Sequence, residues 1–331
     1  IFMLPIVSFF GLITNILVIL IIFNKKNKKC YKENQRQLNY LAMNSFFNAF
    51  ECLITEFSLM SECLGMNSIF CSSVMIQVQE FKIYFVEYVG ESMKTISILT
   101  MLAFSFERFF HVINSKESQN RFVRKLLQMK LRYHMLIFAF ISFSTCFIVT
   151  YKYDTDHFYS SQHQNPTLAM YDLVYKRNSH WFQSLFLFHY LLNDFILLFI
   201  NILIDILMVK QTKLNLAKKK EFAMKLLEQS EGRNAEALKR LKEIKKSNRH
   251  TNQLLLYSFL IFIFCRLPEL AINVTFSFPW YNIDMAYTLL PNLFSIVQFL
   301  YIISYFTNIY FYYKFNFAFK QSFKTFFSIK S

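Results

Sequence analysis

The sequence predicts an all-α fold, a seven-transmembrane helix bundle followed by a short membrane-parallel eighth helix. Hydrophobic residues make up 54% of the 331 residues and aromatic residues 19%, which leaves too little polar surface for a soluble protein of this length. Seven stretches are also near or above the ~20 apolar residues that cross a ~30 Å hydrocarbon core. The expected spans are residues 1–23, 38–60, 80–110, 133–150, 181–209, 252–276 and 287–313.

The distribution of positive charge predicts the orientation of the spans. Four segments hold 30 of the 36 Lys and Arg residues, whereas the loops between them hold only Lys152, Lys176 and Arg177. Positive loops stay in the cytoplasm, so the N-terminus is expected outside. This topology explains the net charge of +15, and we expect no nucleic-acid partner. The four basic segments are residues 24–37, 108–132, 210–251 and 314–331.

The seven-transmembrane domain is expected to cover residues 1–313, including a long cytoplasmic loop at 210–251, and residues 314–331 follow it. In the cytoplasmic loop 210–251, charged and apolar residues at helical spacing predict helix on both sides of a break at residues 230–233. This loop would extend spans five and six as a docking surface, or it would be a solvated basic linker. Residues 314–331 hold helix 8 and a short tail. We expect the stretch Phe315–Phe327 to lie on the membrane as a helix, because its Phe side chains alternate with basic residues.

Six cysteines divide by their expected location. Only Cys63 and Cys71 lie in an outer loop, where oxidation is expected, so a disulfide between them is predicted. A bridge between Cys71 and Cys146 and a pair of free thiols are the alternatives.

Motifs on five spans, in order, resemble those of the rhodopsin-like G-protein-coupled receptors. The resemblance covers nearly the whole chain and implies a divergent, invertebrate-type member of that family. Span three ends in Glu107-Arg108, similar to the family's Glu/Asp-Arg-Tyr, and span seven carries Asn308 and Tyr312, similar to Asn-Pro-x-x-Tyr. The remaining matches are Asn15 with Val18 in span one, Leu41-Ala42 in span two, and Cys265-Arg266-Leu267-Pro268 in span six.

The resemblance implies a receptor in the plasma membrane, with an extracellular peptide or small-molecule ligand and a heterotrimeric G protein as its partners. Arg108 would form the floor of the G-protein site, paired with Glu107 or facing water until the partner fills it. Pro268 would provide the hinge of span six. No cofactor, metal or enzymatic activity is expected, since no nucleophile, zinc or phosphate-binding motif is found.

Several positions depart from the family pattern. Ser45 stands where span two usually carries an Asp, so a carboxylate-based sodium site is not expected, although Ser97 and Asn308 could still make polar contacts in the core. Arg266 replaces the usual Trp of span six. Asn248 stands where some members place an acid that pairs with the Arg of span three.

Charged residues within the spans predict the ligand pocket. On span three, Glu87, Glu91 and Lys94 lie at i, i+4 and i+7, about 31, 25 and 21 Å above Arg108 for a regular helix. Six acids against two bases leave a formal charge of −4, which favours a cationic ligand, a basic peptide before a small amine. Internal ion pairs, Glu91 with Lys94 and Arg266 with Glu269, are the alternative. The other acids are Glu51, Glu56, Asp194 and Glu269.

A seven-span transporter or channel is the rival class. It would use the intramembrane acids as an ion path. It leaves the positions of Glu107, Arg108, Asn308 and Tyr312 unexplained, and no internal repeat is visible in the sequence. Ion flux without a G protein would favour it, and nucleotide exchange on a G protein would favour the receptor.

Overall fold

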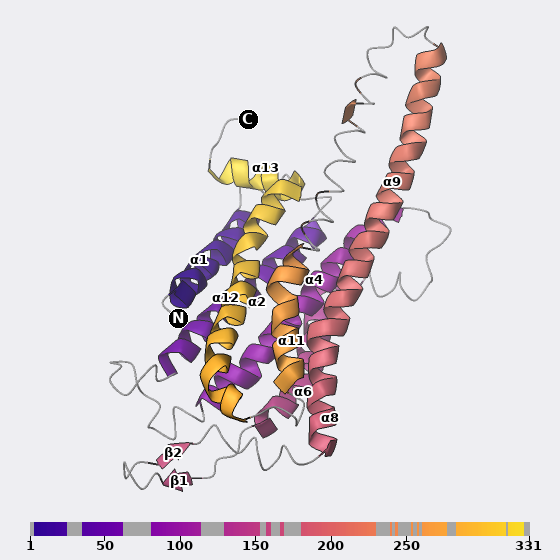
Figure 1. Ribbon diagram of the computed structural model, residues 1–331. Coiled ribbons are helices and arrows are strands. Elements are labelled where there is room, and N and C mark those ends of the chain that lie inside the picture. Colours follow the sequence, from indigo (N-terminus) through magenta and orange to yellow (C-terminus); the bar gives the residue numbers. More distant parts are fainter. Residues whose placement is uncertain are drawn as a thin grey trace.

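The computed structural model is a bundle of long helices (Figure 1). Helix is found at each of the seven expected spans and at the expected eighth helix, so the prediction of an almost entirely helical protein is confirmed. The structure describes residues 3–24, 35–61, 81–113, 129–152, 157–159, 166–168, 180–229, 260–276, 283–315 and 317–327, together with Lys239, Lys242, Glu243, Gln253 and Tyr257.

The helices follow one another in a simple order. The first spans are α1 (Met3–Phe23), α2 (Gln35–Ser61) and α4 (Gly90–Ile113). They are followed by α6 (Leu131–Cys146), α8 (His180–Tyr190), α9 (Leu197–Gln229) and α11 (Leu267–Phe276). The chain then forms α12 (Ile283–Phe315) and α13 (Phe317–Phe326).

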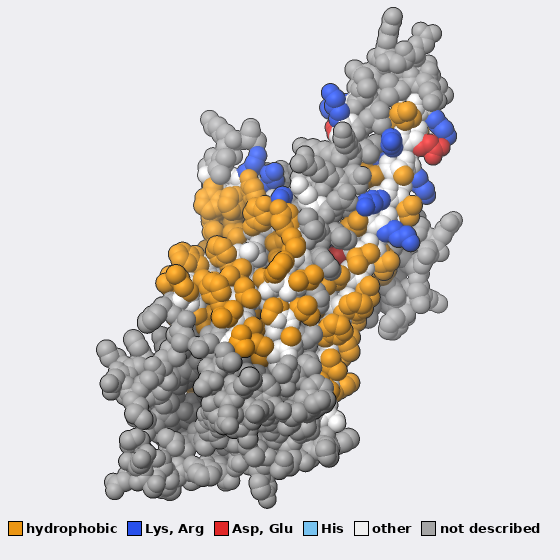
Figure 2. Space-filling view, viewed as in Figure 1, with side chains coloured by type: hydrophobic (Ala, Val, Ile, Leu, Met, Phe, Trp, Pro, Cys, Tyr) orange, Lys and Arg blue, Asp and Glu red, His pale blue; other side chains and the backbone are white. Residues whose placement is uncertain are grey.

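Apolar side chains cover the outside of the bundle. Leu136 is 66% exposed and Phe140 is 75% exposed on α6, and Figure 2 shows hydrophobic side chains along the flank of the bundle with Lys and Arg gathered toward one end. Such a belt requires an apolar solvent. Within the described residues, three helical stretches are long and apolar enough to cross a membrane: Met3–Phe23, Leu131–Thr150 and Leu187–Lys225.

Helix α4 lies at the centre of the bundle, in contact with α2, α6 and α9, while α1 packs against α2 and α12. Helices α1 and α2 pack closely at Gly11, where an added Cβ would lie 2.8 Å from Cys52 Sγ. A small residue there lets the two backbones come together. The central place of α4 brings its polar residues to the interior.

Three helical segments are wider than an α-helix. Residues Lys82–Val89 (η2), Leu191–Ile196 (η4) and Phe262–Arg266 (η5) form π-helical turns that lead into α4, α9 and α11. A π-helical turn inserts residues into the helix and rotates the segment before it relative to the segment after it. Glu91 and Lys94 lie together in α4, whereas Glu87 lies in the π-helical segment, so the single face expected for all three stays a prediction for Glu87.

One end of the bundle carries both α13 and the C-terminal half of α9 (Figure 1), and we call it the α13 end. Helix α9 continues unbroken to Gln229, so the first half of the loop 210–251 is helical and extends span five, as predicted. The break at residues 230–233 and the stretch 244–250 lie outside the described residues. Helix α13 packs against α1 and α12.

The sequence did not predict any strand. Between α6 and α8, after a short 3₁₀ turn (η3, Phe147–Lys152), β1 (His157–Tyr159) pairs antiparallel with β2 (Pro166–Leu168). The two strands lie at the end of the bundle opposite α13, which we call the strand end (Figure 1).

Candidate functional site

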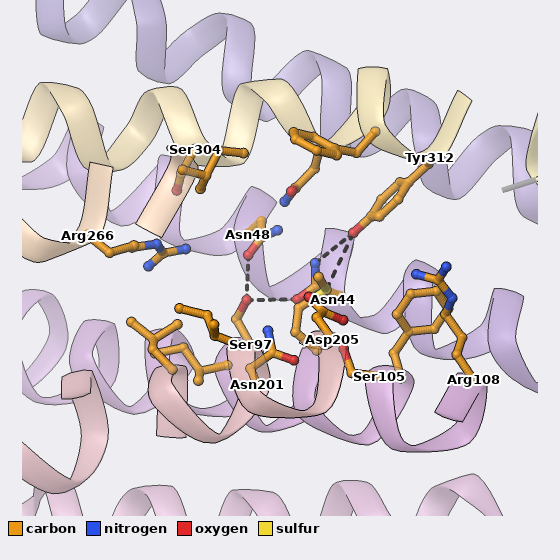
Figure 3. A pocket seen from close by; sticks show the side chains of 18 residues that line it. Asn44, Asn48, Ser97, Ser105, Arg108, Asn201, Asp205, Arg266, Ser304 and Tyr312 are labelled. Atoms are coloured by element: carbon orange, nitrogen blue, oxygen red, sulfur yellow. Dashed lines mark hydrogen bonds between the residues drawn. The ribbon is translucent and has the colours of Figure 1, made fainter. Parts of the chain in front are cut away.

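A polar cavity of about 150 Å³ lies in the interior of the bundle, between α2, α4, α9, η5 and α12. In Figure 3 Arg266 and Arg108 lie at its two ends, with Asn201 and Asp205 between them. A cavity of this volume has room for about five water molecules, and its polar lining provides their partners. The other polar residues that line it are Asn44, Asn48, Ser97, Ser105, Ser304, Asn308 and Tyr312.

Hydrogen bonds on one wall of the cavity connect three helices. The hydroxyl of Ser97 on α4 lies 2.9 Å from Asn44 Oδ1 and 2.5 Å from Asn48 Oδ1, both on α2. Asn44 Nδ2 in turn donates to the hydroxyl of Tyr312 on α12, at 2.9 Å. All four side chains are buried, so each of these bonds replaces water and fixes the spacing of the helices.

The positions predicted for the polar core are only partly brought together. Asn15 lies apart from the cavity and connects α1 to α12, since its Nδ2 donates to the carbonyls of Gly11 at 2.8 Å and Tyr305 at 3.4 Å. Ser45 is fully buried, and its Oγ has no hydrogen-bond partner among the described residues. The residue of α2 next to it in sequence, Asn44, is the one that contacts Ser97.

Arg108 reaches the cavity at the α13 end, with its guanidinium 5.4 Å from the ring of Phe104. Of the two alternatives for Arg108, pairing with Glu107 or facing water, the first is not seen among the described residues, where Glu107 Oε2 lies 3.4 Å from Arg36 Nε of α2. Residues 107 and 108 point to different neighbours because successive residues of a helix differ by about 100° in direction. The carboxylate of Asp205 on α9 lines the same cavity and attracts Arg108 electrostatically.

A charged cluster lies nearer the strand end. Lys94 Nζ is 2.9 Å from Glu269 Oε1 on α11 and 3.5 Å from Glu91 Oε2 on its own helix. The Lys94 side chain is only 3% exposed. The expected pair Glu91–Lys94 is therefore present, whereas Glu269 pairs with Lys94 and not, as expected, with Arg266.

Aromatic rings of α12 contact both cations of this cluster. The guanidinium of Arg266 lies 3.8 Å from the ring centroid of Tyr301 and 5.0 Å from that of Tyr305. The ammonium of Lys94 lies 4.8 Å from the Tyr301 centroid. Rings at these distances stabilise cations in a poorly hydrated site, and they connect α4 and η5 to α12.

The surplus of negative charge is smaller than the sequence suggested. Glu51 of α2 is within electrostatic range of Glu91, Glu269, Lys94 and Arg266, so three carboxylates face two cations with a formal charge of −1. Among the described residues no ion pair joins the half-buried Glu87 to the cluster. The expected charge of −4 in one pocket is not found within the described residues, and the side chain of Asp194 lies outside them.

The cysteine predictions are tested only in part. Cys63 and Cys71 lie outside the described residues. Cys146 is a buried free thiol whose sulfur lies 3.6 Å from Thr95 Oγ1 and 3.8 Å from Asn193 Nδ2, so the alternative bridge from Cys71 to Cys146 is absent.

Sequence reasoning missed part of the cavity. Asn44 and Asn48 lie four residues apart, which places both on one face of α2, and their spacing could have identified them. Asn201 and Asp205 show the same spacing on α9. A polar pair at i and i+4 in an apolar span was the available signal.

Comparison of the chain with family models gave no match, and comparison with curated proteins gave none either. The motifs and the geometry of the cavity and the charged cluster are therefore the basis for assigning a function.

Proposed function

We propose that the chain is a seven-span receptor of the rhodopsin-like type, which binds an extracellular ligand and activates a heterotrimeric G protein at its cytoplasmic face. The α13 end would face the cytoplasm of the plasma membrane. This orientation agrees with the gathering of Lys and Arg at that end.

One observation carries the proposal. Residues that the sequence matches to separate family motifs, Arg108 of span three and Asn308 with Tyr312 of span seven, line a single cavity near the α13 end. Spans three and seven are far apart in the sequence, so the meeting of these residues is a property of the fold and not of the sequence patterns. A cavity between helices that is lined by polar side chains and has room for several water molecules is a suitable place for a two-state change.

The mechanism depends on which helices meet there. Outward movement of span six would open the α13 end and expose Arg108, while the hydrogen bonds of Ser97, Asn44 and Tyr312 hold spans two, three and seven together. The π-helical segment Phe262–Arg266 ends directly before α11, two residues from Pro268, so the backbone of span six is already irregular where it must bend. A ligand would act by its different affinity for the two arrangements.

The test uses purified chain in lipid nanodiscs with heterotrimeric G proteins. A screen of basic peptides and amines should find at least one compound that accelerates nucleotide exchange. The same chain in sealed vesicles, without G protein, should carry no ion current beyond that of empty vesicles. Flux without nucleotide exchange would reject the receptor and favour the transporter.

A further inference from the structure

Lys94 and Glu269 form a buried ion pair between two helices that the proposed mechanism requires to separate. Their N–O distance is 2.9 Å, and the exposed fractions of their side chains are 3% and 19%. Lys94 belongs to α4, at the centre of the bundle, and Glu269 belongs to the first turn of α11. Separating α11 from α4 at this level therefore means separating two buried charges.

The surroundings of the Lys94 ammonium are those of a binding site for a primary amine. Carboxylate oxygens of Glu91 and Glu269 contact it from two helices, and the ring centroid of Tyr301 lies 4.8 Å away. Two anions and an aromatic ring around one ammonium are the groups that recognise an alkylammonium ligand. In this chain the side chain of Lys94 itself occupies the position that such a ligand would take.

Glu51 is the third acidic residue of the charged cluster. One carboxylate oxygen of Glu51 is buried without a hydrogen-bond partner among the described residues, and Arg266 is held against Tyr301 and Tyr305. Loss of the Lys94 charge would leave the carboxylates of Glu91 and Glu269 with Arg266 as the one cation of this cluster among the described residues. Uncompensated buried carboxylates are costly, so the site should then accept a cation from solution.

We infer that Glu91, Glu269 and Tyr301 form an alkylammonium subsite occupied by the chain's own Lys94, and that the Lys94–Glu269 ion pair clamps α11 against α4. The further step, that a ligand amine releases the clamp by taking the place of Lys94 beside Glu269, rests on the proposed function. It makes a primary amine, such as a peptide N-terminus or a Lys side chain, the required group of the ligand.

A double-mutant cycle in apparent Tm tests the clamp. Lys94→Met and Glu269→Gln should each lower Tm by about 5–10 °C, and the double variant should lower it by clearly less than the sum. The matched control is the pair Lys225–Glu221 on α9, which has the same 2.9 Å distance but is 65% and 68% exposed. Lys225→Met and Glu221→Gln should shift Tm by less than about 2 °C and should add. Equal coupling at the two pairs would overturn the clamp.

Chemical rescue tests the subsite. n-Butylammonium, which matches the side chain of Lys94, should raise the Tm of Lys94→Ala in a saturable manner and should not raise that of the parent. The neutral analogue n-butanol should have no such effect. Failure of rescue in Lys94→Ala, or equal rescue by n-butanol, would overturn the subsite. If Lys94→Ala does not fold, Lys94→Gly prepared in n-butylammonium and then dialysed serves instead, and Tm should fall as the amine is removed.

These measurements do not involve a G protein, so they separate the two proposals. Coupling and rescue without any nucleotide exchange would retain the subsite and reject the receptor. Nucleotide exchange with neither coupling nor rescue would retain the receptor and reject the subsite.

Discussion

At the scale of single residues, the placement of Arg108 decides how the α13 end can function. Burial of a guanidinium is costly unless it has partners, and Arg108 has the ring of Phe104 and the electrostatic attraction of Asp205 across a cavity. Arg108 lines the cavity, and under the proposed function a group of the G protein that enters from the α13 end would contact it. Its neighbour Glu107 is bound to Arg36 and holds α4 to α2.

We predict that Arg108→Ala abolishes stimulated nucleotide exchange while surface expression and ligand binding stay near those of the parent. The residue lies at the α13 end, far from the charged cluster. Its loss should therefore affect only the contact with the G protein. Arg132→Ala is the matched control, since Arg132 lies exposed at the start of α6, 4.8 Å from the ring of Tyr133. Exchange by Arg108→Ala equal to that of the parent, at matched surface levels, would contradict the assignment.

Asn44 is the residue on which the polar network depends most. Asn44→Ala removes the bonds to Ser97 and Tyr312 together, and we expect a loss of ~1–3 kcal/mol in the free energy of unfolding because buried groups are left unsatisfied. Thr14→Ala is the control, as its hydroxyl bonds to carbonyls of its own helix, and its effect should stay within ~0.5 kcal/mol. Denaturation in detergent with a thiol-reactive dye measures both. Similar losses in the two variants would show that the network contributes little.

At the scale of helices, aromatic side chains attach α13 to the bundle. Phe319 is fully buried, and its ring centroid lies 5.8 Å from that of Tyr312, at the end of the cavity wall. Phe323 extends the contact to Tyr313, with the centroids 5.0 Å apart. Helix α13 therefore holds the Tyr312 ring in position through its contact with Phe319.

Phe319→Ala should cost ~3–5 kcal/mol of stability because it leaves a cavity beneath α13. Phe327, which is 46% exposed, provides the control, and Phe327→Ala should stay below ~1 kcal/mol. Thermal unfolding of each variant in nanodiscs gives the comparison. The membrane-parallel position of this helix stays a prediction, and spin labels at Lys320 and Phe327 should report a water-facing and a lipid-facing site, respectively. Full water exposure of both labels would contradict it.

At the scale of the whole molecule, one predicted constraint concerns the strand end. We expect Cys63 and Cys71 to form a disulfide, because Cys52, Cys146 and Cys265 are buried free thiols and Cys30 belongs to a cytoplasmic segment in the predicted topology. Mass mapping of non-reduced protein should recover one cross-linked peptide that contains both residues. Recovery of both as blocked free thiols would refute the bridge.

The helical architecture and the inventory of charged residues could be predicted from the sequence. Runs of apolar residues and the sparsity of Gly and Pro determine where helices form, since the backbone must satisfy its own hydrogen bonds in an apolar solvent. Helix α13 and the extension of α9 were predictable for another local reason, the pattern of charged and apolar residues along each segment. The motif residues Arg108, Asn308 and Tyr312 could be identified from their spacing alone.

Only the tertiary structure decided which charges meet. Lys94 could have paired within its helix alone, yet the packing of α11 against α12 brings Glu269 within 2.9 Å of it. Asp205 and Arg108 share a cavity because α9 packs on α4. Local periodicity fixes which face of a helix a residue occupies, whereas the rotation and depth of neighbouring helices, which depend on contacts distant in sequence, fix its partner.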